Sequence, residues 1–135
     1  MVTLCKLNKL LVIDDDKHNN YLTEYRFRKA QLPYELKFKD SIEEAIGILS
    51  QKNEYIPDLI LLDLNLPILN GWDFLNWYDG RNPEHLRDVI IYILSSSVDE
   101  DEKKKAYSYP FVSGFIEKPL KLDHIKHIKE RYFAE

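Results

Sequence analysis

The sequence predicts an α/β fold in which five parallel strands form one sheet with helices on both faces. Three observations lead to this prediction. Segments with the composition of strands recur along the chain, helical patterns occupy every interval between them, and three of the strand segments are unbroken apolar runs. Strict alternation of strand and helix is typical of a parallel sheet, and an unbroken apolar strand is typical of one covered on both faces.

The five predicted strands differ in strength, and that difference predicts their order. They are Leu10–Ile13, Tyr34–Lys39, Leu59–Leu62, Val89–Leu94 and Val112–Ile116. The second alternates apolar and polar residues, and the fifth is interrupted by Ser113 and Gly114. Weak strands suit the edges of a sheet and continuous apolar strands suit its middle. With the strands numbered along the chain, the predicted order is 2-1-3-4-5.

Helical patterns fill the intervals between the strands. They cover Asn19–Lys29, Ile42–Leu49, Trp72–Tyr78, residues 98–107 and Leu122–Phe133. In the second, apolar residues recur at i, i+3, i+4 and i+7, which predicts one buried face, and Ser41 is placed to cap the helix. In the first, the predicted buried row is Tyr21, Leu22 and Tyr25.

The fourth helical segment, VDEDEKKKAY, has almost no apolar face. Its acidic residues stand four positions before its lysines, an order that stabilises a helix. The three pairs are Asp99–Lys103, Glu100–Lys104 and Asp101–Lys105. Two interpretations stay open: the charged face is simply solvated, or the helix is a loosely held element that can shift.

The composition excludes several classes of protein. The 135 residues carry a formal charge of −4, which argues against a general nucleic-acid-binding surface. The single cysteine, Cys5, excludes an internal disulfide framework. No signal-peptide pattern and no apolar run of about 18 residues is present. We therefore expect a cytoplasmic protein in which residues 1–135 form a single domain, with its core at about residues 8–133 and no output domain. Two points stay open: whether it is a monomer or a weak homodimer, and whether these residues stand alone or are part of a longer chain.

Aspartates follow two of the predicted central strands. Asp14, Asp15 and Asp16 come after the first strand, and Asp63 comes directly after the third. The carboxyl ends of neighbouring parallel strands meet at one edge of a sheet, so these side chains should converge. Clustered carboxylates repel one another, and a hard divalent cation such as Mg²⁺, which prefers oxygen ligands, resolves that conflict. The alternative for Asp14–Asp16 is a solvated acidic turn, but this does not explain why Asp63 directly follows a buried strand.

Two more strand ends carry groups that bind phosphate. Ser95, Ser96 and Ser97 follow the fourth strand and offer hydroxyl donors, and Lys118 follows the fifth and offers an ammonium group. Each signal is weak alone, because serine runs are common in turns and a lysine before a proline is commonly on the surface. Together the four strand ends predict a phosphate site beside a cation.

The motifs VIDDD, LILLDLNLPILNGW, YILSSS and FIEKP occur in an order and spacing similar to the response regulator receiver domain, the CheY-like fold of two-component signalling. The resemblance covers about Asn8 to Phe133. It implies a phosphoacceptor signalling switch, with Mg²⁺ as cofactor, rather than an enzyme that turns over a separate substrate. It also implies a sensor histidine kinase or phosphotransfer protein as donor. A downstream protein would be reached through the fourth helix and fifth strand, with neither nucleic acid nor a membrane as direct partner.

The resemblance assigns roles to the acidic residues. By it, Asp63 is the phosphoacceptor and Asp15 is a direct Mg²⁺ ligand. Asp14 would act through water or hydrogen bonding, and the backbone carbonyl of Asn65 would be a further ligand. Asp16 matches a variable position and is not an expected ligand.

The resemblance also assigns the remaining site residues. Lys118 matches the phosphate-binding lysine, with a cis peptide bond expected before Pro119. The serine that provides the switch hydroxyl can be assigned in two ways. The spacing to Lys118 points to Ser96, whereas alignment from the fourth strand points to Ser95. We favour Ser95. Phe115, three residues before the lysine, matches the aromatic position that rotates when the domain is phosphorylated.

Two other functions compete with the switch. One is a pseudo-receiver, an interaction module that works without phosphorylation. The other is a haloacid-dehalogenase-type phosphatase, because IDDD contains an Asp-x-Asp pattern with Asp14 as nucleophile and Asp16 as acid or base. The phosphatase leaves three features unexplained: Asp63 and the turn residues Pro67 and Gly71, where a glycine allows close backbone approach or a positive φ.

Overall fold

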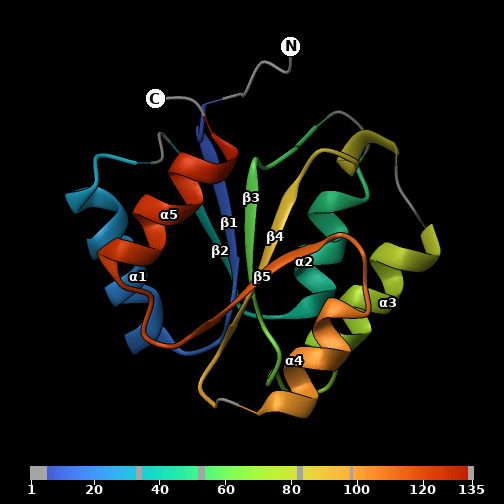
Figure 1. Ribbon diagram of the computed structural model, residues 1–135. Helices are drawn as coiled ribbons and strands as arrows, with labels where there is room; N and C mark the ends of the chain where they lie inside the picture. Colours follow the sequence, from blue (N-terminus) through green and yellow to red (C-terminus); the bar gives the residue numbers. More distant parts are fainter. Residues whose placement is uncertain (1–5, 33–34, 52–53, 82–83, 98, 134–135) are drawn as a thin grey trace.

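The computed structural model describes residues 6–32, 35–51, 54–81, 84–97 and 99–133. There, a central sheet is covered by helices on both faces (Figure 1). The strands are β1 (Lys9–Ile13), β2 (Glu35–Lys39), β3 (Leu59–Asp63), β4 (Ile90–Ser95) and β5 (Val112–Glu117). The helices are α1 (Lys17–Lys29), α2 (Ile42–Leu49), α3 (Gly71–Arg81), α4 (Glu100–Tyr107) and α5 (Leu122–Tyr132), with a 3-10 turn at Glu84–Leu86. In this part of the chain no helix is long and apolar enough to cross a membrane.

The sheet has the predicted topology. All five strands are parallel and lie in the order β2-β1-β3-β4-β5. Every residue of β3 is buried, whereas every residue of the edge strand β2 is only partly buried. This difference follows from position, because a central strand is covered on both faces while an edge strand keeps contact with water. The carboxyl ends of the strands therefore meet at one edge of the sheet.

Two apolar cores, one on each face of the sheet, hold the layers together. Alternate residues of a strand point to opposite faces, so neighbours in the sequence enter different cores. Leu10 and Leu61 pack on the face that α1 and α5 cover, and Leu11 and Leu62 pack on the face that α2, α3 and α4 cover (Figure 1). All four side chains are fully buried. This double burial fixes the strands that carry the site.

The predicted elements are all present, with small shifts at their ends. α2 spans the predicted residues, and Ser41 caps it by accepting a backbone hydrogen bond at 3.2 Å. α1 begins earlier than predicted because the Asp16 carboxylate caps it, accepting the Asn19 N–H at 3.1 Å. Two residues predicted to begin elements, Tyr34 and Val98, lie outside the described residues.

The predicted buried face of α1 is wrong. Tyr21 and Tyr25 are exposed over 68% and 49% of their surface, and the row that faces the interior is Asn19, Thr23 and Phe27. Apolar periodicity could not reveal this row, because two of its three members are polar. The consequence is that Asn19 enters the interior where α1 meets the end of β1.

The charged helix α4 has few apolar contacts with the rest of the fold. Ala106 is the only residue of α4 that is buried, which confirms the predicted lack of an apolar face. The predicted acid–lysine pairs are not among the ion pairs of the described residues. The Lys105 ammonium instead lies 4.3 Å from the centre of the Trp72 ring on α3. An exposed ion pair contributes little stability, and the face of a tryptophan competes well for the cation.

The first turn of α5 depends on an unprotonated histidine. The Nδ1 of His124 accepts the backbone N–H of Lys121 at 3.0 Å, which requires Nδ1 to carry no proton. Burial, and then the charge of Lys121, lower the pKa of His124 below its ordinary 6.5. The unfolded chain therefore binds this proton more readily, so the contribution of neutral His124 to stability is complete above pH 6.5 and is lost as the pH falls toward the lower folded-state pKa.

We expect His124→Gln to reduce this pH dependence. Glutamine accepts the same N–H at this helix position but does not titrate near neutrality. Thermal unfolding measured from about pH 7.5 down to about pH 5.5 should show a smaller loss of stability for His124→Gln than for the unsubstituted protein. His127→Gln is the matched control, because His127 is exposed on the same helix. Equal pH slopes for His124→Gln and the unsubstituted protein would contradict the role of the neutral ring.

Candidate functional site

Three carboxylates meet at the carboxyl edge of the sheet. Asp14 directly follows β1, and Asp63 is the last residue of β3. Both are buried, at 1% and 4% exposure, while Asp15 is exposed. One oxygen of each of the three lies within 4.8 Å of the others. The predicted convergence of the strand-end aspartates is therefore present.

Lys118 lies between the two buried carboxylates. Its ammonium Nζ is 2.9 Å from Oδ2 of Asp14 and 3.3 Å from Oδ2 of Asp63. The peptide bond from Lys118 to Pro119 is cis, as predicted. Burial alone would lower the pKa of Lys118, but Asp14 and Asp63 outweigh that effect and raise it. The lysine is thus held charged, as the counter-charge of the buried acids.

Burial is also the main influence on Asp63. It raises the pKa of the Asp63 carboxyl to about 6, and the Asp14 carboxylate adds to the rise, while the Asn65 N–H and the Lys118 ammonium act in the opposite direction. The Asn65 N–H donates to Asp63 Oδ1 at 3.1 Å. One oxygen of Asp63 is therefore bound by a backbone N–H and the other by an ammonium. The Asp63 carboxylate is thus oriented by one donor at each oxygen, and its charged neighbours shift its pKa in opposite directions.

The two candidate switch residues lie on β4 and β5. Ser95 is the last residue of β4 and fully buried, whereas Ser96 is exposed. The Lys118 N–H donates to the carbonyl oxygen of Ser95 at 2.7 Å, so this backbone directly adjoins the lysine. Phe115, on β5, is partly buried against the core beneath α2, α3 and α4. Ser95, at the end of β4, is therefore the serine that is enclosed near the site.

Asn19 and Asn20 donate hydrogen bonds to Asp14, and neither was among the site residues predicted from the sequence. Nδ2 of Asn19 donates to Asp14 Oδ2 at 2.9 Å, and Nδ2 of Asn20 donates to the Asp14 carbonyl oxygen at 2.9 Å. Asn19 is buried at 4% exposure. A polar residue at the head of the inward row that continues to Thr23 and Phe27 is the signal that could have identified Asn19.

The donors at this site suit a hard divalent cation. Carboxylate oxygens are the ligands that Mg²⁺ and Mn²⁺ prefer, and Mg²⁺ in proteins is held by one or two carboxylates with waters completing its shell. Asp15 is exposed to water, and its carboxylate lies against those of Asp14 and Asp63. The cluster is thus able to hold a metal ion.

Gly71 packs directly against the end of β3. A Cβ added at Gly71 would lie 2.7 Å from Cα of Leu64 and 2.8 Å from the carbonyl oxygen of Asp63. Of the two reasons expected for a glycine here, close backbone approach is the one present, because no described glycine has a positive φ. Helix α3 and the strand that carries Asp63 are therefore in backbone contact.

We expect Gly71→Ala to cost about 1–3 kcal/mol of unfolding free energy, because backbone atoms cannot rotate away from the added methyl group. Gly80→Ala on the same helix is the matched control, since a Cβ there meets nothing within 4 Å. Alanine is the better helix former, so this control should gain about 0.5–1 kcal/mol. Urea unfolding measures both, and a Gly71→Ala protein as stable as the control would contradict the predicted clash.

Comparisons with known proteins agree with this geometry. The response regulator receiver domain family matches residues 10–130. The response regulator Rcp1 of Synechocystis sp. is 30% identical over 102 residues, which are 73% of this chain and 68% of that protein. A structure of the Mn²⁺-bound form of Rcp1 has a TM-score of 0.72, with 27% identity over 90% of this chain and 91% of that one.

A second solved structure resembles the fold more strongly. A two-component response regulator from Cytophaga hutchinsonii has a TM-score of 0.86 and 26% identity, and the match covers 93% of this chain and 96% of that one. A further relative, FilR2 of Methanothrix harundinacea, is 32% identical over 56% of this chain, but the match spans only 46% of that protein. The family match covers nearly all of the sheet, the helices and the acidic cluster. The chain belongs to the response regulator receiver domain family.

Proposed function

We propose that the protein is a phosphoacceptor signalling switch in which Asp63 receives a phosphoryl group from the phosphohistidine of a sensor kinase or phosphotransfer protein. The observation that carries the proposal is the placement of Asp63. It is buried at the end of a central strand, 3.3 Å from the Lys118 ammonium and beside the carboxylates of Asp14 and Asp15. A bound cation and an incoming phosphoryl group would give this crowded arrangement of charges a chemical purpose.

The transfer forms a bond between a carboxylate oxygen of Asp63 and phosphorus, and it breaks the bond between phosphorus and the donor's imidazole nitrogen. The imidazole leaves with that electron pair, and hydrolysis of the resulting acyl phosphate by water returns Asp63. Attack by one anion on another requires positioning and charge neutralisation. Lys118 provides one positive charge. Asp15, Asp63 and the carbonyl oxygen of Asn65 would hold Mg²⁺, with Asp14 acting through water or hydrogen bonding, and the bound ion would supply the remaining positive charge.

The signal would travel from Ser95 to Phe115. A phosphoryl oxygen on Asp63 accepts a hydrogen bond from the Ser95 hydroxyl, whose oxygen now accepts the Ser97 N–H at 3.3 Å. Movement of Ser95 leaves space for the Phe115 ring, and the surface of β5 and α4 changes with it. Helix α4 suits this role because Ala106 is the only residue it buries.

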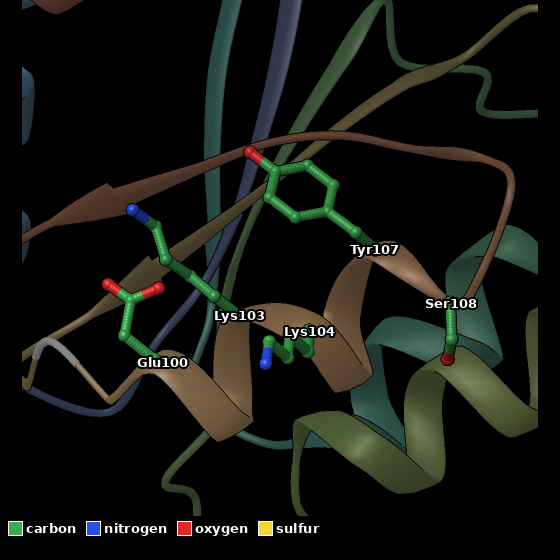
Figure 2. Close-up of a pocket in the computed structure, with 5 residues that line it drawn as sticks. All are labelled: Glu100, Lys103, Lys104, Tyr107 and Ser108. Carbon is green, nitrogen blue, oxygen red and sulfur yellow. The ribbon is translucent and has the colours of Figure 1, made fainter.

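The surface over α4 is hollowed where a partner would bind. A cavity of about 470 Å³ is lined there by five residues: Glu100, Lys103, Lys104, Tyr107 and Ser108 (Figure 2). Tyr107 also lines a second cavity with Gly114 and Phe115 of β5. A rotation of Phe115 would therefore change the surroundings of an exposed α4 side chain, which supports α4 and β5 as the output surface.

Intact mass measurement after incubation with acetyl phosphate and Mg²⁺ tests the proposal. We expect one phosphoryl adduct, dependent on Mg²⁺, that decays when the donor is removed. Absence of an adduct with this donor and with phosphorylated histidine donors would support the pseudo-receiver alternative instead. Sustained hydrolysis of a phosphomonoester, lost in Asp14→Asn, would support the phosphatase alternative.

A further inference from the structure

We propose that Asn19 is a positioning residue of the acidic site, which holds the Asp14 carboxylate in the orientation that cation binding requires. The proposal rests on the phosphoacceptor function and adds to it a residue that contacts neither phosphate nor cation directly. It is carried by the hydrogen bonds that Asp14 makes, independently of any titration.

Asp14, Asp16 and Asn19 form a closed ring of hydrogen bonds. The Asp16 N–H donates to Asp14 Oδ1 at 2.9 Å, Asp16 Oδ1 accepts the Asn19 N–H at 3.1 Å, and the Asn19 amide donates to Asp14 Oδ2 at 2.9 Å. Each oxygen of the Asp14 carboxylate is thus held by a donor from one short segment. Asp16, which is not an expected cation ligand, acts here as the cap that places Asn19.

The ring matters because the other donor to Asp14 is shared. Lys118 Nζ contacts Oδ2 of both Asp14 and Asp63. When a phosphoryl group sits on Asp63, that ammonium has a new anionic partner, and Asp14 keeps Asn19 as a donor that is neutral and buried. The Asp14 carboxylate is only 1% exposed, so the loss of a hydrogen-bond donor without replacement would destabilise the fold. Asn19 therefore keeps the Asp14 carboxylate oriented in both states of the site.

The amide is also suited to the charge of the cluster. Three carboxylates and one ammonium already leave the site negative, and a second lysine at position 19 would repel an incoming cation. Asparagine donates a hydrogen bond without adding charge. Groups that orient metal ligands in this way commonly affect metal affinity by about 10–100-fold when they are removed.

Binding of Mn²⁺, followed by electron paramagnetic resonance of the free ion, tests the role of Asn19. Asn19→Leu keeps the number and branching of the side-chain heavy atoms and loses the donor, so the dissociation constant for Mn²⁺ should rise by about ten-fold or more. Thr23→Val is the matched control, because Thr23 is fully buried on the same face of α1 and its hydroxyl has no hydrogen-bond partner among the described residues. The control should bind Mn²⁺ as the unsubstituted protein does.

A second variant separates positioning from packing and keeps the test valid if Asn19→Leu does not fold. Asn19→Ala has a smaller side chain but also loses the donor, so Mn²⁺ should raise the unfolding temperature of both Asn19→Ala and Asn19→Leu less than that of the unsubstituted protein. A residue needed only for packing would leave both rises unchanged. Unchanged Mn²⁺ affinity in Asn19→Leu, or an unchanged rise in unfolding temperature in Asn19→Ala, overturns the inference. If the unsubstituted protein binds no Mn²⁺, the phosphoacceptor proposal fails first.

Discussion

Replacing Asp63 with asparagine is expected to abolish phosphorylation of the protein. The amide has nearly the same shape and its oxygen can still accept the Asn65 N–H that now binds Asp63 Oδ1 at 3.1 Å. It is, however, a far weaker nucleophile than a carboxylate, so no acyl phosphate forms. Intact mass after incubation with acetyl phosphate and Mg²⁺ should show only the unmodified Asp63→Asn protein.

Asp79→Asn provides the matched control for this experiment. Asp79 is an exposed aspartate on α3 and makes none of the described contacts at the acidic cluster. It should gain the adduct at the rate of the unsubstituted protein. A phosphoryl adduct on Asp63→Asn, stable in the same conditions, would mean that another group accepts the phosphate.

Replacing Lys118 with methionine is expected to have the largest effect on stability. The substitution keeps an unbranched side chain as far as Cε and removes the ammonium that lies 2.9 Å from Asp14 and 3.3 Å from Asp63. Removing one partner of a buried ion pair commonly costs about 3–5 kcal/mol, because the remaining charge is buried without compensation. Urea unfolding without divalent cations should therefore show a loss of about 3 kcal/mol or more.

Divalent cations should restore part of that loss, because a cation in the cluster compensates the same carboxylates. Lys121→Met is the control, since Lys121 is exposed and its side chain forms none of the described ion pairs. It should change the unfolding free energy by less than about 0.5 kcal/mol. A Lys118→Met protein as stable as Lys121→Met, in the absence of cations, would show that the buried acids do not depend on this ammonium.

The sheet and the carboxylate cluster were predictable for the same reason. Unbroken apolar runs identify the central strands and the alternating segment identifies β2 as an edge, and this pattern fits the observed order β2-β1-β3-β4-β5. Once the order is known, residues that directly follow neighbouring strands must converge. Asp14 and Asp63 are found this way, and Lys118, which follows β5, lies at the same edge of the sheet.

The helix surfaces were less predictable, because their contacts depend on tertiary packing. On α1 the row that faces the interior includes Asn19 and Thr23, which no hydrophobic pattern selects. On α4, the Lys105 ammonium lies over the Trp72 ring of α3, whereas the sequence spacing had paired it with Asp101. Sequence spacing gives the neighbours of a side chain along its own helix, but not the competing groups that another helix presents.

The choice between two serines shows a similar limit. Counting back from Lys118 pointed to Ser96, while alignment from the strand pointed to Ser95. The pairing of β4 with β5 contains an irregularity between Ile91 and Tyr92, which makes a count of residues across the two strands unreliable. Burial separates the serines instead, since Ser95 is enclosed and Ser96 is exposed. Ser95 therefore stays the favoured switch hydroxyl.

Chemical trapping of the acyl phosphate tests the central claim most directly. Borohydride reduces a phosphorylated aspartate to the corresponding alcohol, and peptide mass mapping then identifies the residue that was modified. After phosphorylation by acetyl phosphate with Mg²⁺, the proposed role of Asp63 requires reduction at Asp63 and at no other aspartate, including Asp14, which is also buried beside Lys118. Reduction at Asp14 in place of Asp63 would contradict the claim.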